Sequence, residues 1–108
     1  MKKLFQGAIT TGAGTLCYTV PTGIRTEVQD IVIANTTTGT LSCSLHLVPT
    51  GVAVGSSNAM FSSVPVPANT TVHWSGMQVL NAGDFIQGIS SASGLTVNIT
   101  GNENRAGT

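Results

Sequence analysis

Charged side chains are scarce in this chain. Lysine, arginine, aspartate and glutamate together make up 7% of the 108 residues, and the formal net charge is zero. An average soluble domain has roughly 25% charged residues. Binding to nucleic acid depends on clustered lysine and arginine side chains that displace counterions from phosphates. The sequence has no basic cluster, so we expect no nucleic-acid partner.

Long apolar runs are missing as well. The basic start is followed by two apolar residues, Leu4 and Phe5, before Gln6 and Gly7, whereas the core of a secretion signal needs roughly 7 to 15 apolar residues. No stretch approaches the roughly 18 apolar residues of a membrane-spanning helix. We therefore expect a soluble protein that is made in a cytoplasm and has no membrane partner.

Reactive side chains are few and far apart in the sequence. Cys17 and Cys43 are the only cysteines, too few for a disulfide framework, so we expect free, reduced thiols. His46 and His73 lie on different predicted strands, and neither has a cysteine or carboxylate at a local metal-ligand spacing. We expect the histidines to face solvent or an interface, and we expect no metal site and no cofactor.

Catalytic motifs are missing too. The closely spaced carboxylates of Glu27 and Asp30 are the type of pair that a glycosidase uses. They lie beside Arg25, so ion-paired structural acids are the simpler interpretation. The G-x-S-x-G turn of an α/β-hydrolase is absent. We therefore expect a protein that is not an enzyme.

Alternating apolar and polar residues predict β-strands. Residues 41–48 place Leu41, Cys43, Leu45 and Leu47 on one face, with serines and a histidine on the other. This alternation is typical of a half-buried strand. Threonine, serine and glycine, which are frequent throughout, are weak helix formers, and no segment shows a helical period.

A second strand is predicted over residues 25–34, where β-branched residues are frequent. Val28 is out of register with Ile31, which indicates a bulge near Gln29 and Asp30. A threonine-rich turn separates this segment from the alternating strand described above. The two strands are therefore predicted to form a hairpin.

The remaining predicted strands cover residues 4–10, 15–20, 59–66, 70–75, 85–90 and 95–100. The last two are joined by a short Ser/Gly turn, which predicts a second hairpin. Residues 49–58 are expected to form a long exposed loop, and 77–82 at most a turn. About eight short strands at this spacing predict an all-β protein, a single antiparallel β-sandwich of jelly-roll type over residues 1–108, with a mobile polar tail at 102–108.

The low charge also bears on the surface. A small monomer normally keeps itself soluble with mixed charges, but this chain combines few charges with a mean hydropathy of +0.29. Neutral and apolar side chains are easily desolvated in a protein contact. We therefore expect a homo-oligomer, with a trimer favoured. The candidate contact residues are the apolar Leu4, Phe5, Met60, Phe61 and Trp74.

Turn and strand-start motifs follow one another in an order that resembles a known group of proteins. They include Y-T-V-P-T-G at 18–23, V-P-A-N-T-T at 66–71 and L-N-A-G-D-F-I at 80–86. Over residues 16–103 the chain resembles small β-sandwich proteins encoded in the structural-gene regions of tailed bacteriophages. The resemblance implies a virion role, as a capsid decoration or cement protein, a head fibre, or a tail or adaptor module. It brings no catalytic residues.

The hypothesis from the sequence is a capsid decoration protein that binds the major capsid protein, or other virion proteins, on the outer shell. Such a protein is assembled in the host cytoplasm and becomes part of the virion. The N-terminal segment 2–11 is a candidate for strand addition or for contact with the capsid. Two alternatives stay open. One is a tail-fibre module that binds a carbohydrate or a receptor through Trp74, Tyr18 or the 49–58 loop, and the other is a neck or tail connector.

Overall fold

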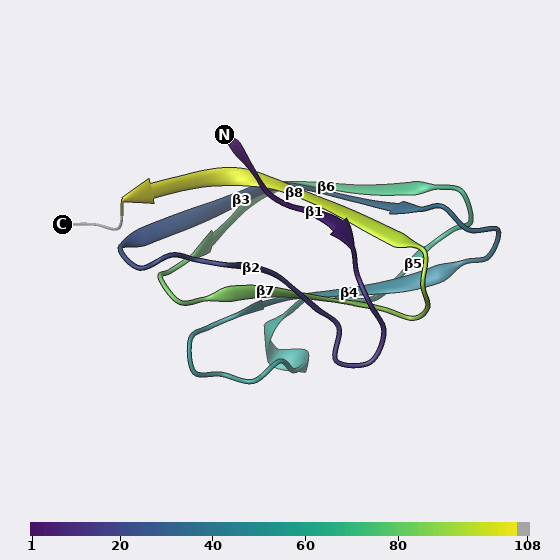
Figure 1. The fold of residues 1–108 in the computed structure, drawn as a ribbon, viewed down its shortest axis with the longest axis horizontal. Coiled ribbons are helices and arrows are strands. Elements are labelled where there is room, and N and C mark those ends of the chain that lie inside the picture. The colour runs from purple at the N-terminus through teal and green to yellow at the C-terminus, as the bar shows by residue number, and fades with distance from the viewer. Residues whose placement is uncertain (106–108) are drawn as a thin grey trace.

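The computed structural model describes residues 1–105, which form two packed β-sheets (Figure 1). The elements are, in chain order, β1 (Lys2–Ala8), β2 (Thr15–Thr19), β3 (Ile24–Asn35), β4 (Leu41–Val48), the short 3-10 helix η1 (Ser56–Asn58), β5 (Ala59–Val66), β6 (Thr71–Leu80), β7 (Phe85–Ser90) and β8 (Leu95–Arg105). One sheet has the order β1-β8-β3-β6 and the other β2-β7-β4-β5. All pairings are antiparallel. The prediction of an all-β sandwich is confirmed.

Successive strands mostly alternate between the two sheets. The chain crosses from one sheet to the other at every connection except that between β4 and β5, which is the strand order of a jelly roll. Both predicted hairpins are therefore wrong, because β3 and β4 lie in different sheets, and so do β7 and β8. A short polar turn between two strands has the same composition whether the strands pair side by side or face each other across a sandwich.

The core lies between the sheets and is lined by every second residue of the strands. On β4 the side chains of Cys43 and Leu45 are fully buried, as the alternation predicts. On β8 the inward positions are Leu95, Val97 and Ile99, which are also fully buried. The threonine and asparagine side chains between them form the outer face of that strand.

The predicted bulge in β3 is confirmed. The register of β3 against both of its neighbours shifts between Val28 and Asp30. The extra residue, Gln29, allows Val28 and Ile31 to point into the core together, and both are buried. A strand without this bulge would turn one of the two apolar side chains towards solvent.

Two strands are longer than predicted. β6 runs on to Leu80, into the segment 77–82 where at most a turn was expected, and β8 runs on to Arg105, into the expected tail. Both extensions pair with the first part of β3, where Thr26 lies opposite Leu80. Pairing between segments so far apart in the sequence leaves no local signal. The rest of the predicted tail, 106–108, lies outside the described residues.

A glycine in the middle of β7 marks a place where core side chains pack very closely. A Cβ atom at Gly88 would lie 2.9 Å from the Cγ2 atom of Ile9 and 3.3 Å from the Sγ atom of Cys17. A methyl group at this position would therefore displace its neighbours. The missing side chain lets them fill the space between the sheets.

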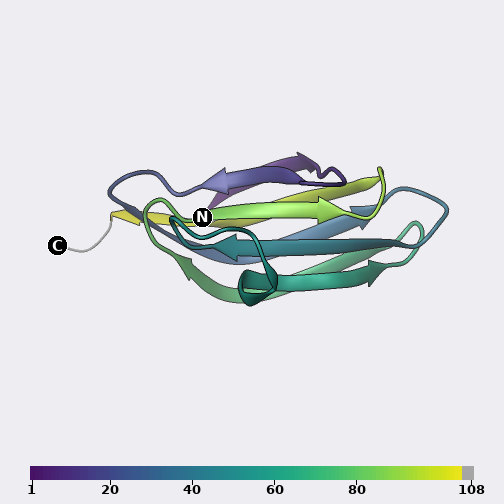
Figure 2. The ribbon, with the colours of Figure 1, turned by 90° about the horizontal axis from the view of Figure 1, so that it is seen from below.

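The 49–58 loop folds back over the outer face of the β2-β7-β4-β5 sheet, where η1 lies in front of the strands (Figure 2). It covers the imidazole of His46, whose Nδ1 atom lies 3.1 Å from the carbonyl oxygen of Gly55 and 3.1 Å from Oδ1 of Asn58. His46 is buried as a result. The expectation that His46 faces solvent or an interface is wrong, because the loop returns onto the polar face of β4.

Candidate functional site

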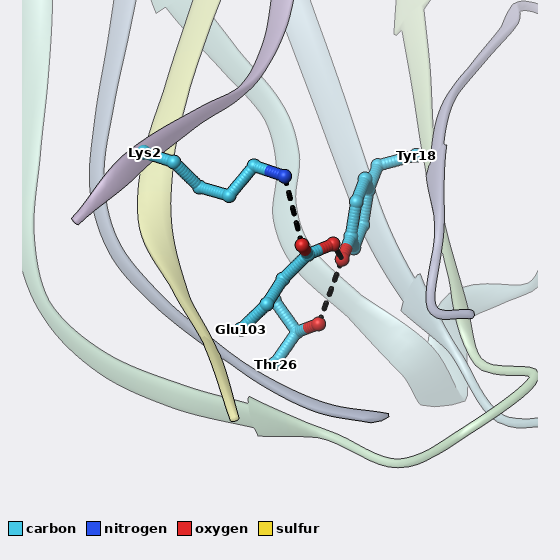
Figure 3. A network of polar contacts seen from close by, with 4 residues as sticks. All are labelled: Lys2, Tyr18, Thr26 and Glu103. Carbon is cyan, nitrogen blue, oxygen red and sulfur yellow. Dashed lines mark hydrogen bonds and ion pairs between the residues drawn. The ribbon is translucent and has the colours of Figure 1, made fainter. Parts of the chain in front are cut away.

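Four polar side chains connect the two sheets on the β1–β2 side of the sandwich and are called the polar cluster below (Figure 3). Lys2 of β1, Thr26 of β3 and Glu103 of β8 come from one sheet, and Tyr18 of β2 comes from the other. The Lys2 ammonium lies 2.8 Å from Oε1 of Glu103, and the Tyr18 hydroxyl lies 2.8 Å from Oγ1 of Thr26. The Tyr18 hydroxyl also donates a hydrogen bond to Oε2 of Glu103. The carboxylate is thus held between an ammonium and a phenol.

The protonation states of the polar cluster favour structure over catalysis. Burial, together with the nearby carboxylate, raises the pKa of Tyr18 to about 12, so the phenol stays protonated and donates. The hydrogen bond from Lys2, aided by the one from Tyr18, holds the pKa of Glu103 below its usual range. A general acid or base needs a pKa near the working pH. These two shifts move the pKa values of both groups away from pH 7, so the cluster stabilises the arrangement of four strands.

The two cysteines are free, as predicted. Cys17 on β2 and Cys43 on β4 are both buried, and β7 lies between their strands. Two strand spacings alone separate their Cα atoms by about 10 Å, and an offset along the strands adds to this distance, which exceeds the reach of a disulfide. Burial raises the pKa of Cys17 to about 11 and that of Cys43 to about 12. Both thiols are therefore protonated and poor nucleophiles.

The second histidine, His73, is exposed on β6, and its Nε2 atom contacts the carboxylate of Asp30 on the neighbouring strand β3. Asp30 thus has a partner, as expected of a structural acid, but the partner is His73 and not Arg25. The two side chains meet because β6 pairs with β3, which the sequence did not indicate. Within residues 1–105, no three histidine, cysteine or acidic side chains lie close enough together to hold a metal ion. In the same part of the chain, no helix is long and apolar enough to cross a membrane.

The five apolar residues expected at an interface lie mainly on the inner side of the sheets. Leu4, Phe5, Met60, Phe61 and Trp74 are each half-buried and pack against the core. A register shift in β1 accompanies the inward packing of the first two. Most of the area of these five side chains is therefore used within the chain, and β1 itself is paired with β8.

The apolar side chains that are exposed lie elsewhere. They are Met1, Leu16, Val52, Val54, Met77 and Val79. Met77 and Val79 belong to the part of β6 for which the sequence predicted a turn, so neither was expected on an exposed strand. The available signal was the absence of proline and of any charged residue between Thr71 and Leu80, which is compatible with one continuous strand.

The residues considered for carbohydrate binding do not come together. Tyr18 lies on β2 and Trp74 on β6, at opposite edges of the two sheets. The Tyr18 hydroxyl is engaged in the polar cluster. The ring of Trp74 packs beside Gly76, where a Cβ atom would lie 2.9 Å from it. The 49–58 loop covers a third region, over β4, so the three elements share no platform for a sugar.

A cavity of about 370 Å³ opens on the other side of the sandwich, between β5 and β6. It is lined by Leu47, Asn58, Ala59, Met60 and Gln78. No charged side chain and no nucleophile line it, so it offers room without catalytic chemistry.

Comparisons with protein-family models, with curated proteins and with solved structures gave no match for this chain.

Proposed function

We propose that this chain is a non-enzymatic structural protein of a tailed-bacteriophage virion, which decorates the outer capsid shell as an oligomer. The observation that supports this most is a neutral part of the outer face of the β1-β8-β3-β6 sheet, which lies beside a row that carries Lys3 and Asp30. Two adjacent rows of side chains cross this face from β1 to β6 without a lysine, arginine or carboxylate. They are Gln6–Asn98–Val32–His73 and Ala8–Thr96–Ala34–Thr71. We call these two rows the neutral face.

The neutral face is suited to protein contact for an energetic reason. Removing a charged group from water costs several kcal/mol unless the group is paired in good geometry, whereas hydroxyl and amide groups are readily satisfied by a partner or by trapped water. Interface cores are accordingly depleted of charged residues. A sheet face of this kind can be buried against another protein at many equivalent positions on a shell.

The resemblance to small phage β-sandwich proteins supports the same proposal and indicates the partner, the major capsid protein. The cavity, the thiols and the polar cluster suggest no competing reaction, because none of them combines an activated nucleophile with a base. In this proposal the protein resides in the virion and acts by burying part of its surface against other virion proteins.

The proposal is tested by locating the protein on particles. Purified particles, with and without this protein, are compared by electron cryo-microscopy, and the protein is expected as added density on the outer shell. Density at the neck or the tail would replace decoration by a connector or adaptor role. Absence of the chain from purified particles would refute a virion role.

Two variants then test the surface. Asn98→Lys places a charge at the centre of the neutral face and is expected to lower occupancy on shells about tenfold or more. Thr19→Lys places the same charge at an exposed position on the other sheet and is expected to leave occupancy unchanged. If the two variants bind equally well, the neutral face is not the contact.

A further inference from the structure

The outer edge of β6 has unpaired backbone groups over residues 71–75. The amide of Asn35 donates to the carbonyl of Thr70, so even-numbered residues of this part of β6 direct their backbone groups towards β3. The amides and carbonyls of Thr71, His73 and Ser75 therefore point away from the sheet. These three residues are exposed, and β6 is the last strand of its sheet.

The other three edge strands carry features that discourage pairing with a further strand. β1 has two lysines, Lys2 and Lys3, and a register shift directly after them. β2 is only five residues long and is also irregular in register. β5 contains Pro65, which has no amide hydrogen, and Ser63 with a φ of 49°. Lysine, proline, irregularity and shortness are the usual means by which proteins protect a sheet edge. Residues 71–75 contain no lysine, no proline and no register shift, and they belong to a strand of ten residues.

The side chains of residues 71–75 are arranged symmetrically by type about the middle of this segment. It starts after Asn69, whose φ of 52° interrupts the extended chain, and ends where the register against β3 shifts beyond Ser75. The sequence between is T-V-H-W-S, centred on His73. An antiparallel copy placed about His73 pairs hydroxyl with hydroxyl, Thr71 with Ser75, and apolar with apolar, Val72 with Trp74. Cross-strand pairs of these kinds are favourable.

We propose that two copies of this chain associate through β6, antiparallel about a twofold axis at His73, so that the two four-stranded sheets become one continuous sheet of eight strands. Backbone hydrogen bonds of Thr71, His73 and Ser75 provide the contact, as in other cases of strand addition. A second copy is the fitting occupant because the paired side chains complement themselves under a twofold axis, as an isologous contact requires. Because the net charge of the chain is zero, two copies do not repel each other through their overall charge.

The pairing does not depend on the proposed function. It predicts a dimer, whereas the sequence favoured a trimer, and it leaves the neutral face accessible, since an edge contact extends the sheet in its own plane. The combined face of two copies would simply be twice as wide.

Cysteine cross-linking tests the register. At the twofold axis the two copies of residue 73 form a hydrogen-bonded pair with Cα atoms about 5.5 Å apart, which a disulfide can bridge. His73→Cys, in the full chain with oxidised glutathione, is expected to give a covalent dimer. Thr71→Cys and Ser75→Cys, each alone, are expected to stay monomeric on a non-reducing gel, because each position lies about 14 Å from its own copy. Mixing these two variants is expected to restore cross-linking. Equal cross-linking of all three variants, or of none, would overturn the register.

Sedimentation tests the association itself. The unmodified chain is expected to rise from 11.0 kDa to twice that mass between about 1 μM and about 1 mM. His73→Lys sets two like charges opposite each other, while its ammonium can still contact Asp30, and is expected to raise the dissociation constant about tenfold or more. Thr19→Lys, at an exposed position on β2 of the other sheet, is expected to leave the dissociation constant unchanged. A monomer at all concentrations, a trimer, or a dimer insensitive to His73→Lys would overturn the proposal.

Discussion

The two long sides of the sandwich are closed in opposite ways. On the β1–β2 side, the polar cluster joins four strands, and both edge strands carry features that discourage further pairing. On the β5–β6 side, the sheets enclose an open cavity, β6 exposes Met77 and Val79, and its backbone edge over residues 71–75 is free. The polar side-chain network is thus on one side and the free strand edge on the other, where the buried Asn35 donates one hydrogen bond across the sheets, 2.9 Å from its Nδ2 atom to the carbonyl oxygen of Val66.

This difference indicates that the two sides of the domain have different roles. Polar groups that all have hydrogen-bond partners fix one arrangement of strands, because each alternative leaves a buried group unpaired. An edge with unpaired backbone groups and little charge fixes nothing by itself but can accept a second chain. We therefore expect substitutions on the β1–β2 side to affect the free energy of unfolding and those on the β5–β6 side to affect association.

The largest stability effect is expected for Tyr18→Phe. Removing the hydroxyl leaves Oγ1 of Thr26, a fully buried residue, without its tyrosine partner, and it removes one of the bonds to Glu103. Loss of a buried partner costs about 1–3 kcal/mol, measurable as a lower urea midpoint. Gln78→Ala on the other side serves as the control and is expected to stay within about 0.5 kcal/mol. Equal effects of the two variants would remove the distinction between the sides.

The next largest effect is a loss of stability in alkali. The pKa values of Tyr18, Cys17 and Cys43 are raised to about 12, about 11 and about 12 in the folded state. Their contribution is fully present below the ordinary values of 10.0 for tyrosine and 9.0 for cysteine and is lost as the pH rises towards 12. Urea midpoints measured at several pH values above 8 should fall in this window. Tyr18→Phe should flatten the fall, and an unchanged profile would contradict the assignment.

Lowering the pH is also expected to reduce stability, through Glu103. Its pKa is lowered in the folded state, so its contribution is present above the ordinary value of 4.5 and is lost as the pH falls below it. Glu103→Gln cannot ionise and should reduce the slope of stability against pH in this range. A slope identical to that of the unmodified chain would show that the carboxylate in the polar cluster contributes little.

Much of the sandwich could be predicted from the sequence, but not the connections between its strands. The alternation over β4 and the bulge in β3 were recognisable because burial of one face requires them locally. Which strands are neighbours in a sheet could not be recognised, because the turns after β3 and β7 cross between the sheets. For the same reason the polar cluster was missed. Lys2, Tyr18 and Glu103 are brought together only by non-local strand pairing, and each alone is an ordinary surface residue.

Thiol labelling sharpens the comparison between an edge strand and a central strand. Cys17 lies on the edge strand β2, and Cys43 on the central strand β4. Local opening is easier at an edge, so Cys17 is expected to react faster with an aromatic disulfide reagent under native conditions. Tyr18→Phe should speed the labelling of Cys17 more than that of Cys43. If both rates rise equally, the polar cluster stabilises the whole sandwich and not one side of it.

The smallest effect is expected at the cavity. Ala59 is half-buried and lines this space, so Ala59→Val adds two methyl groups where room already exists. Partial burial of that area should stabilise the chain by about 0.5 kcal/mol. Ala8→Val, at an exposed position on β1, controls for the preference of valine for strands. A loss of more than about 1 kcal/mol for Ala59→Val, with Ala8→Val unchanged, would mean that the β5–β6 side is packed as tightly as the core. The contrast between a closed and an open side would then be confined to the polar cluster and the β6 edge.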